Sequence, residues 1–408
     1  MSVATKSGVA RRQAGGFTAW MAVLAAVALA GLLGWIYQLS RGLVVTHMRD
    51  VTSWGLYITA FMFFVGLSAG GLIISAAANL FNAKHFKPVA LPALVLSLAS
   101  ILVAAALIIV DLGMPQRILN LVLHPQFVSP LMWDVLVITT YILVEVAYLW
   151  AMATRRASVV RLLAMVALPV AVLVHSVTAW IFGLLVARPY WNSAIMAPLF
   201  VASALDSGLA LLIVVLWLLH RAGLWRVERT QFHQLANLLA VLVPVDLFMM
   251  AAEMLTGTYA GSGTAEGAFM LRAMTGPYAW ALWTEIGLAL VAFVALCWER
   301  VRTHPSAVAG LSVLVVLSVF FKRIALMAGA MTEPYLHLPP GVSMGEPQPA
   351  GTAVFQTSQM YAPSALEWLI FAGVVATAAL AFSWVARSWL APLWASMGRP
   401  ESYAEEHA

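Results

Sequence analysis

Charged residues are scarce in this sequence. Asp, Glu, Lys and Arg make up 10% of the 408 residues, hydrophobic residues make up 62%, and the mean hydropathy is +0.91. Because soluble domains contain roughly 25% charged residues, this composition excludes a soluble chain. Apolar stretches of about 20 residues, each long enough to cross a bilayer as a helix, recur along the sequence. They predict an all-α, polytopic membrane protein with ten spans, at 16–39, 54–80, 88–110, 129–151, 160–186, 194–219, 234–256, 276–298, 307–331 and 361–387.

Cysteine is nearly absent, and few histidines lie within the predicted spans. The single cysteine, Cys297, excludes an intrachain disulfide and a cysteine-ligated cluster. Haem held between helices needs axial ligands such as paired histidines at mid-membrane depth, and of nine histidines only His175 lies so deep. Metal-binding spacings such as C-x-x-C and H-E-x-x-H do not occur in the sequence. We therefore expect no haem and no metal in this chain.

The first apolar stretch has some features of a cleavable signal peptide. Lys6, Arg11 and Arg12 precede it, and Ala28-Leu-Ala30 resembles a signal-peptidase site. The apolar run nevertheless continues to Leu39, which makes it longer than the core of a usual signal peptide. We therefore predict that it is an uncleaved transmembrane helix.

Lysine and arginine are distributed unevenly between the loops. Of 22 in total, only five fall in loops on the side opposite the N-terminus, while Lys322 and Arg323 lie within a span; the five are Arg41, Arg49, Arg117, Arg188 and Arg272. Because loops rich in Lys and Arg face the cytoplasm, both termini are predicted to be cytoplasmic, in a bacterial inner membrane. The longer loops, 256–277 and 332–360, then lie on the outer side. The net charge of +5 thus comes from Lys and Arg residues placed according to the topology of the chain in the lipid membrane. No nucleic-acid partner is expected.

Acidic residues are concentrated inside the predicted spans. Eight of the 17 lie in a span or at its edge, namely Asp111, Asp134, Glu145, Asp206, Asp246, Glu253, Glu285 and Glu367. A charge at the bilayer centre costs about 2.5–3.5 kcal/mol on insertion scales, so such residues are rare without a compensating role. Structural ion pairs are one explanation, but Lys322 and Arg323 are too few to neutralise eight acids. The other explanation is a proton route through buried carboxyl groups.

The predicted proton route is a set of acids and bases on several helices. It comprises Glu145, Asp206, Asp246, Glu253, Glu285, Lys322 and Arg323. Asp246 and Glu253 are spaced to share one face of a helix, as a relay requires, and Asp134 and Glu145 are spaced likewise. Lys322 and Arg323 must find counter-ions among the acids.

Several short motifs follow one another between residues 54 and 191. They are Trp54-Gly-Leu-Tyr57, Gly66-Leu-Ser-Ala-Gly-Gly71, Asp111-Leu-Gly-Met-Pro-Gln-Arg117, Ser129-Pro-Leu-Met-Trp-Asp134, His175-Ser-Val-Thr-Ala-Trp180 and Ala187-Arg-Pro-Tyr-Trp191. Taken alone, the small residues at 66–71 are equally typical of close helix packing. Together the motifs resemble those of the NrfD/PsrC family of quinone-interacting membrane subunits, over roughly residues 40–330. Ten spans resemble its longer branch, which includes the DsrP-, HybB- and ActC/ActF-like subunits.

This resemblance implies an architecture. Similar members have two four-helix bundles, here 54–186 and 187–331. A first peripheral helix and loop at 16–53 precede them, and an outer loop, last helix and cytoplasmic tail at 332–408 follow. A short similarity between Phe64–Leu72 and Phe200–Leu209 is in keeping with two bundles but is too short to prove a duplication.

The resemblance also implies a function. The chain would be the membrane subunit of a respiratory oxidoreductase complex and would bind menaquinone or ubiquinone near the outer face. A ferredoxin-like iron–sulfur subunit would dock on that face and exchange electrons with the quinone. A molybdopterin catalytic subunit or a multihaem cytochrome would be a further partner.

The family's site carries over only in part. Several relatives have a histidine in the small-residue stretch, where this chain has Ser68 and Ala69. We predict that other residues contact the quinone, namely Asp111, Arg117, Asp134 and His175, with Ser68 as a weak donor and Trp54, Tyr57 and Trp133 as ring walls. An acid would take the proton of a quinol while an arginine stabilises the anionic oxygen. Each aromatic residue alone is also typical of an interfacial belt, and His175 alone is also typical of a packing hydrogen bond.

Two other classes of protein compete with this interpretation. A proton-coupled secondary transporter would also contain buried acids and two bundles, but it predicts helices broken at mid-depth. Pro169, Pro198 and Pro244 lie within or near spans. A passive anchor for a peripheral enzyme needs no buried charge, so the eight acids count against it.

Overall fold

The computed structural model describes residues 3–49, 52–81, 83, 85–186, 188, 190–259, 261–331, 348–349 and 359–396. Most of the predicted outer loop at 332–360, and the tail after Ser396, lie outside the described residues.

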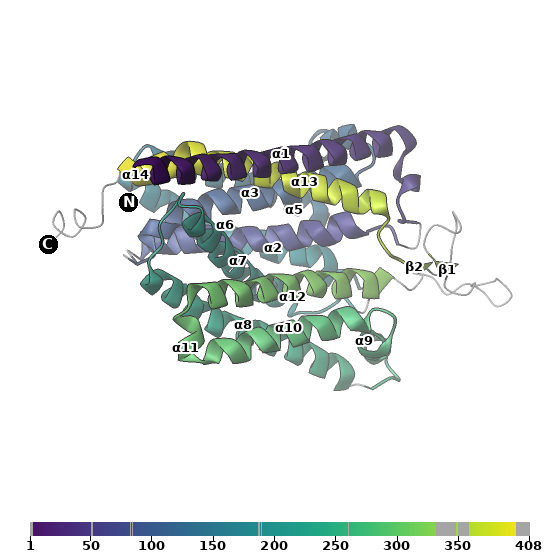
Figure 1. Cartoon of the computed structure of the whole chain (residues 1–408). Coiled ribbons are helices and arrows are strands. Elements are labelled where there is room, and N and C mark those ends of the chain that lie inside the picture. The colour runs from purple at the N-terminus through teal and green to yellow at the C-terminus, as the bar shows by residue number, and fades with distance from the viewer. Residues whose placement is uncertain are drawn as a thin grey trace.

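Ten long apolar helices form the described part of the chain. They are α1 (Val3–Arg41), α2 (Leu56–Leu80), α3 (Lys87–Asp111), α5 (Pro130–Ala153), α6 (Ala157–Gly183), α7 (Met196–Arg221), α8 (Arg229–Tyr259), α10 (Ala279–Cys297), α12 (Pro305–Met331) and α13 (Ala365–Val385). They run roughly parallel or antiparallel to one another (Figure 1). Each is long and apolar enough to cross a membrane, which confirms the ten predicted spans and the polytopic all-α class.

Short elements lie at the helix ends. They are η1 (Leu43–Val45), η2 (Pro115–Leu119), α4 (Asn120–Leu123), α9 (Ala265–Thr275), α11 (Glu299–Arg302), β1 (Gln348–Pro349), β2 (Gln359–Met360), the π-helical turn η3 (Ala386–Leu390) and α14 (Ala391–Ser396). The two strands form a short parallel pair. We call the end of the molecule that carries α9 (right in Figure 1) the α9 end, and the opposite end the α11 end. α1 begins, and α14 ends, at the α11 end.

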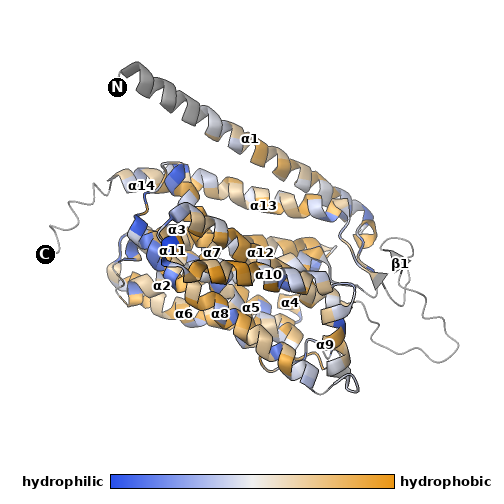
Figure 2. Ribbon diagram, turned by 60° about the horizontal axis from the view of Figure 1, so that its bottom comes forward, coloured by the Kyte–Doolittle hydropathy of each residue, from blue (hydrophilic) through white to orange (hydrophobic). Residues whose placement is uncertain are grey.

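The long helices follow from the sequence because a chain in lipid must satisfy its backbone hydrogen bonds internally. Proline does not break them in the described residues: α6 continues through Pro169, and α8 continues through Pro244. The mid-depth breaks that a transporter would need are thus not present in these helices. Hydrophobic residues dominate the middle of the helices, and hydrophilic residues gather at the α11 end (Figure 2).

The helices pack in two groups of four. Helices α2, α3, α5 and α6 contact one another and form what we call the first bundle, and α7, α8, α10 and α12 form the second bundle. Helices α1 and α13 pair with each other beside α3 (Figure 1). At the centre of this pair the backbones approach closely, since a Cβ atom on Gly31 would lie 2.5 Å from the Cα atom of Gly373.

The two bundles meet along α2 and α7, and glycines allow the contact. A Cβ atom on Gly70 would lie 2.2 Å from the backbone carbonyl carbon of Gly208, closer than atoms can approach. These glycines lie in the two similar segments, Phe64–Leu72 and Phe200–Leu209. Part of the small-residue stretch therefore serves close backbone packing between bundles.

Candidate functional site

At the α9 end of the molecule, a buried carboxylate links the segment after α1 to the start of α13. Glu367 is 0% exposed. Its Oε2 atom accepts hydrogen bonds from the backbone N–H groups of His47 (3.0 Å) and Ser364 (2.8 Å), and its Oε1 atom accepts one from the Tyr361 hydroxyl (2.5 Å). The Tyr361 hydroxyl in turn accepts a hydrogen bond from the backbone N–H of Leu56 (2.7 Å), at the start of α2. Burial, first of all, and then the charge of Glu367 raise the pKa of Tyr361 above its ordinary value.

Tyr57 and Asp111 lie beside this carboxylate, near enough to interact with it electrostatically. The Tyr57 hydroxyl donates a hydrogen bond to Gln38 Oε1 (2.7 Å), and Gln38 Nε2 donates one to the backbone carbonyl of Val110 (3.0 Å). The Oδ1 atom of Asp111 is buried and has no hydrogen-bond partner among the described residues. A buried oxygen of this kind needs a donor, and none of the described residues supplies one. We call Gln38, Tyr57, Asp111, Tyr361 and Glu367 the Asp111 cluster.

Trp54 belongs to an aromatic cluster between the bundles. Its ring stacks on Trp191, with centroids 6.1 Å apart at 25°, and meets Phe182 edge to face at 5.7 Å. The Trp191 indole N–H donates a hydrogen bond to the carbonyl of Leu326 on α12 (2.9 Å). This cluster therefore connects the segment before α2 to α6 in the first bundle and to α12 in the second bundle.

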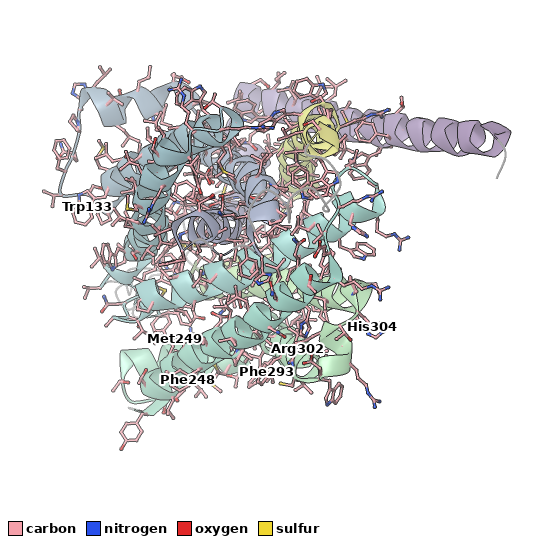
Figure 3. All side chains as sticks on the ribbon, turned by 90° about the vertical axis from the view of Figure 1, so that its left-hand side faces the viewer. Trp133, Phe248, Met249, Phe293, Arg302 and His304 are labelled. Carbon is pink, nitrogen blue, oxygen red and sulfur yellow. The ribbon has the colours of Figure 1, made fainter. Side chains whose placement is uncertain are left out.

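The other predicted quinone contacts lie apart from the Asp111 cluster. Asp134 accepts a hydrogen bond from the Thr178 hydroxyl (2.6 Å), which links α5 to α6. Trp133 is 36% exposed at the edge of the molecule (Figure 3), and its indole N–H donates to the carbonyl of Phe127 (2.6 Å). Arg117 is exposed on η2.

His175 and Ser68 are engaged by backbone carbonyls. The ring nitrogens of His175 lie 2.6 Å from the carbonyl oxygen of Ala171 and 2.9 Å from that of Val65, so both contacts are hydrogen bonds only when the ring carries two protons. The Ser68 hydroxyl donates to the carbonyl of Val65 (2.7 Å) within its own helix. Of the eight predicted contacts, the described structure brings Asp111 and Tyr57 into one cluster.

Glu145 lies in the first bundle, away from the other acids of the predicted proton route. It accepts a short hydrogen bond from the Ser97 hydroxyl, and that hydroxyl lies 3.1 Å from the hydroxyl of Tyr141. The Oε2 atom of Glu145 is buried without a hydrogen-bond partner in the part of the chain that is described.

The remaining members of the route gather in the second bundle. Lys322 Nζ lies 2.5 Å from Asp246 Oδ2 and 3.3 Å from Glu285 Oε1. Arg323 Nη2 donates to the Ser203 hydroxyl (2.5 Å), and its guanidinium carbon lies 3.9 Å from the centre of the Phe200 ring. Lys322 thus finds counter-ions on α8 and α10. Asp206 also interacts electrostatically with Asp246, Lys322 and Arg323. We call Asp206, Asp246, Glu285, Lys322 and Arg323 the Lys322 cluster.

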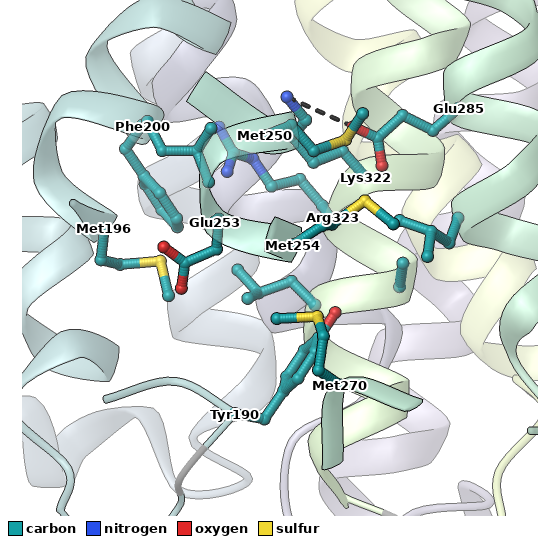
Figure 4. A pocket seen from close by; sticks show the side chains of 14 residues that line it. Tyr190, Met196, Phe200, Met250, Glu253, Met254, Met270, Glu285, Lys322 and Arg323 are labelled. Atoms are coloured by element: carbon teal, nitrogen blue, oxygen red, sulfur yellow. Dashed lines mark ion pairs between the residues drawn. The ribbon is translucent and has the colours of Figure 1, made fainter. Parts of the chain in front are cut away.

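A cavity borders this cluster and reaches Met270 on α9 (Figure 4). The space in it that admits the centre of a water-sized molecule is about 60 Å³. Four charged side chains reach its wall, those of Glu253, Glu285, Lys322 and Arg323, and much of the remaining wall is methionine, from Met196, Met250, Met254 and Met270. Glu253 accepts a hydrogen bond from the Ser193 hydroxyl (2.8 Å).

Sequence reasoning missed two parts of this arrangement. Gln38 and Tyr361 were not expected near Asp111, although a lone glutamine in the first apolar stretch is a signal of a buried polar contact. The cavity was not expected either, because its lining comes from segments more than 100 residues apart, from Tyr190 to Leu326. Among the described residues, no cluster of His, Cys, Asp or Glu side chains could hold a metal ion.

Comparison with known proteins identifies the family. Residues 44–334 match the family described as polysulphide reductase, NrfD. The chain belongs to this family. The match covers more than two thirds of the sequence and confirms the resemblance drawn from the motifs at 54–191.

Three relatives of this NrfD-family chain cover nearly all of it. A putative dimethyl sulfoxide reductase membrane subunit of Halobacterium salinarum is 36% identical, with 88% of each chain covered. A selenate reductase subunit of Mesobacillus selenatarsenatis is 26% identical, with 89% of this chain and 92% of the relative covered. An Hdr-like menaquinol oxidoreductase integral membrane subunit of Archaeoglobus fulgidus is 26% identical, with 90% and 91% covered. This chain is accordingly a multi-pass membrane subunit of the oxidoreductase class.

Proposed function

We propose that this chain is the quinone-reactive membrane subunit of a respiratory oxidoreductase complex. It binds a quinol or quinone near the α9 end and exchanges electrons with a ferredoxin-like iron–sulfur subunit docked there. The observation that carries the proposal is the Oδ1 atom of Asp111, which is buried beside Tyr57 at the end of α3 and has no hydrogen-bond partner in the described part of the chain. A relative that is named a menaquinol oxidoreductase subunit supports quinone as the substrate.

The chemistry follows from the groups in the Asp111 cluster. Oxidation of a quinol releases two protons and two electrons at one place, so a proton acceptor must face the hydroxyl group. Asp111 Oδ1 accepts that hydroxyl's hydrogen bond and then its proton. Tyr57, held by its hydrogen bond to Gln38, lines the position of the quinol. Glu367 already accepts three hydrogen bonds, from the backbone N–H groups of His47 and Ser364 and from the Tyr361 hydroxyl.

The second bundle carries protons in this proposal. Its acids and bases form a connected group around Lys322, and the adjacent cavity brings four charged side chains to one space. Protonatable groups in contact inside a membrane are what a proton relay requires. Glu145 lies outside this group, so we assign the route to the Lys322 cluster and Glu253.

The orientation in the proposal is that both termini are cytoplasmic, in a bacterial inner membrane. The even number of spans supports a common side for both ends, and the Lys- and Arg-poor loops support an outer position for the α9 end. The iron–sulfur subunit then docks on the outer face. A molybdopterin subunit or a multihaem cytochrome completes the complex.

The test is quinol oxidation by the purified complex. Asp111→Asn keeps the size of the side chain but cannot take a proton, so turnover of a soluble quinol analogue should fall to background. Asp134→Asn is the matched comparison, because Asp134 already has Thr178 as a partner. Full activity of Asp111→Asn would remove it from the site, and loss with Asp134→Asn alone would move the site to α5 and α6. The complex should also contain an iron–sulfur protein and bound quinone.

A further inference from the structure

The cavity of the second bundle reaches one side of the Lys322 cluster and not the other. Glu285, Lys322 and Arg323 line it, whereas Asp246 and Asp206 do not. Glu253 also lines it, and this residue is closer than Asp246 to the α9 end of helix α8. The cavity therefore extends from Met270 on α9 and Glu253 to Glu285 and Lys322, whose side chains line the same space (Figure 4).

The four charged side chains in the wall of the cavity favour water as its content. An apolar ring placed there would strip water from four charged side chains, which is costly without compensating contacts. Arg323 is 0% exposed, and its Nε and Nη1 atoms have no hydrogen-bond partner among the described residues. Water molecules in the cavity would supply the acceptors that these two donors need, and a space of about 60 Å³ has room for several.

The Lys322 cluster holds more acids than bases. Asp206, Asp246 and Glu285 face two cations, Lys322 and Arg323. Surplus charge inside a membrane is costly, so the cluster is neutral when one of its three carboxyl groups carries a proton. The ammonium group of Lys322 lies closer to Asp246 (2.5 Å) than to Glu285 (3.3 Å). Glu285, on the cavity side, is thus the carboxyl group less fully paired with Lys322.

We propose that the cavity is a water-filled half-channel that delivers protons from the α9 side to Glu285, and that Lys322 is the gate behind it. The proton on Glu285 passes to Asp246 as the ammonium group moves from Asp246 to Glu285, so the charge of the cluster does not change. Glu253 on α8 and Tyr190 in the loop before α7 line the same space. Asp206 on α7, which interacts electrostatically with Asp246, takes the proton onward. The inference deepens the proposed function and rests on it for the driving reaction.

Cysteine accessibility tests the half-channel without any quinone chemistry. In a Cys297→Ala background, Met254→Cys places a thiol on the cavity wall, and Phe248→Cys places one on the outside of the same helix, where Phe248 is 70% exposed (Figure 3). A charged, membrane-impermeant thiol reagent added at the α9 side of sealed vesicles should label Met254→Cys and leave Phe248→Cys unlabelled. Gly263→Cys, in the open loop before α9, should label in the same vesicles.

Two outcomes of this experiment would overturn the half-channel. One is absence of labelling at Met254→Cys while Gly263→Cys reacts, which would mean that the cavity is dry. The other is protection of Met254→Cys by a soluble quinone analogue, which would mean that the cavity binds quinone.

The gate is tested by the ratio of protons translocated to electrons transferred in vesicles that contain the whole complex. Glu285→Gln should lower this ratio to that of quinol chemistry alone, and so should Lys322→Met/Asp246→Asn, a double variant that retains the net charge of the cluster. Glu299→Gln, on exposed helix α11, is the control. An unchanged ratio in both variants contradicts the gate. If the unmodified complex transfers no electrons from quinol, the proposed function fails, while the labelling result still decides the half-channel.

Discussion

Glu367 shows how one carboxylate can hold distant parts of the chain together. It accepts hydrogen bonds from His47, Ser364 and Tyr361, which come from either end of the sequence. Glu367→Gln replaces one acceptor oxygen by an NH₂ group that faces N–H donors. Because a buried donor left without a partner costs about 1–3 kcal/mol, we expect a clear fall in the thermal unfolding temperature in detergent.

Ser383→Ala is the control for that variant. It also removes a hydrogen bond between α1 and α13, the one from the Trp20 indole (3.1 Å), but this bond is exposed. Its loss should change the unfolding temperature little, since exposed groups exchange their partner for another. Equal effects of the two changes would show that the burial of Glu367 contributes nothing.

Tyr361 gives the same cluster a dependence on alkaline pH. Its pKa is raised in the folded protein, first by burial, whereas an unfolded tyrosine loses its proton near pH ~10. Above that pH the unfolded chain binds fewer protons than the folded one, so stability falls as the pH rises. Unfolding temperatures measured at neutral and at alkaline pH should therefore fall less steeply for Tyr361→Phe than for the unmodified protein. Parallel pH profiles would contradict this.

At the scale of helices, the contact between α2 and α7 depends on glycine. A methyl group on Gly70 meets the backbone of Gly208 at 2.2 Å, and backbone cannot move aside as a side chain can. Gly70→Ala should therefore separate the two bundles locally and destabilise the protein, although alanine is the better helix former by about 1 kcal/mol. Yield and unfolding temperature of the purified protein measure the effect.

Gly287→Ala on α10 separates the packing effect from helix propensity. Apart from its own helix backbone, no atom of the described residues lies within 4 Å of the position where its Cβ atom would be. This variant should be neutral or slightly more stable. A Gly70→Ala protein as stable as Gly287→Ala would mean that the bundles can shift apart without cost.

The positions of the helices were predictable from sequence, because hydropathy is a local property. The predicted span 129–151 corresponds to α5 at Pro130–Ala153, and the predicted span 234–256 lies inside α8 at Arg229–Tyr259. Helix α8 extends beyond the predicted ends at both sides, to Arg229 and Tyr259, and both of these terminal residues are exposed. Ends of this kind are set by contacts with neighbouring elements, which hydropathy does not describe.

At the scale of the whole molecule, the candidate sites were predictable as residue types but not as groups. Intramembrane acids could be found from the cost of burying charge, and Asp111, Asp246 and Glu285 were among them. Their partners could not, because Gln38 and Glu367 reach the end of α3 from opposite ends of the sequence. Such groupings depend on which helices pack together, and a pattern within one helix carries little information about that.

Orientation is the property of the whole molecule on which both proposals depend, and the single cysteine can test it. Cys297 is exposed at the α11 end of α10. If loops rich in Lys and Arg face the cytoplasm, an impermeant thiol reagent should label Cys297 in inverted membrane vesicles and not in intact spheroplasts. Gly263→Cys in the Cys297→Ala background should give the opposite pattern, since it lies at the α9 end. The reverse pattern, with Cys297 labelled in spheroplasts and Gly263→Cys labelled in inverted vesicles, would reverse the positions of the quinone site, the docked subunit and the half-channel.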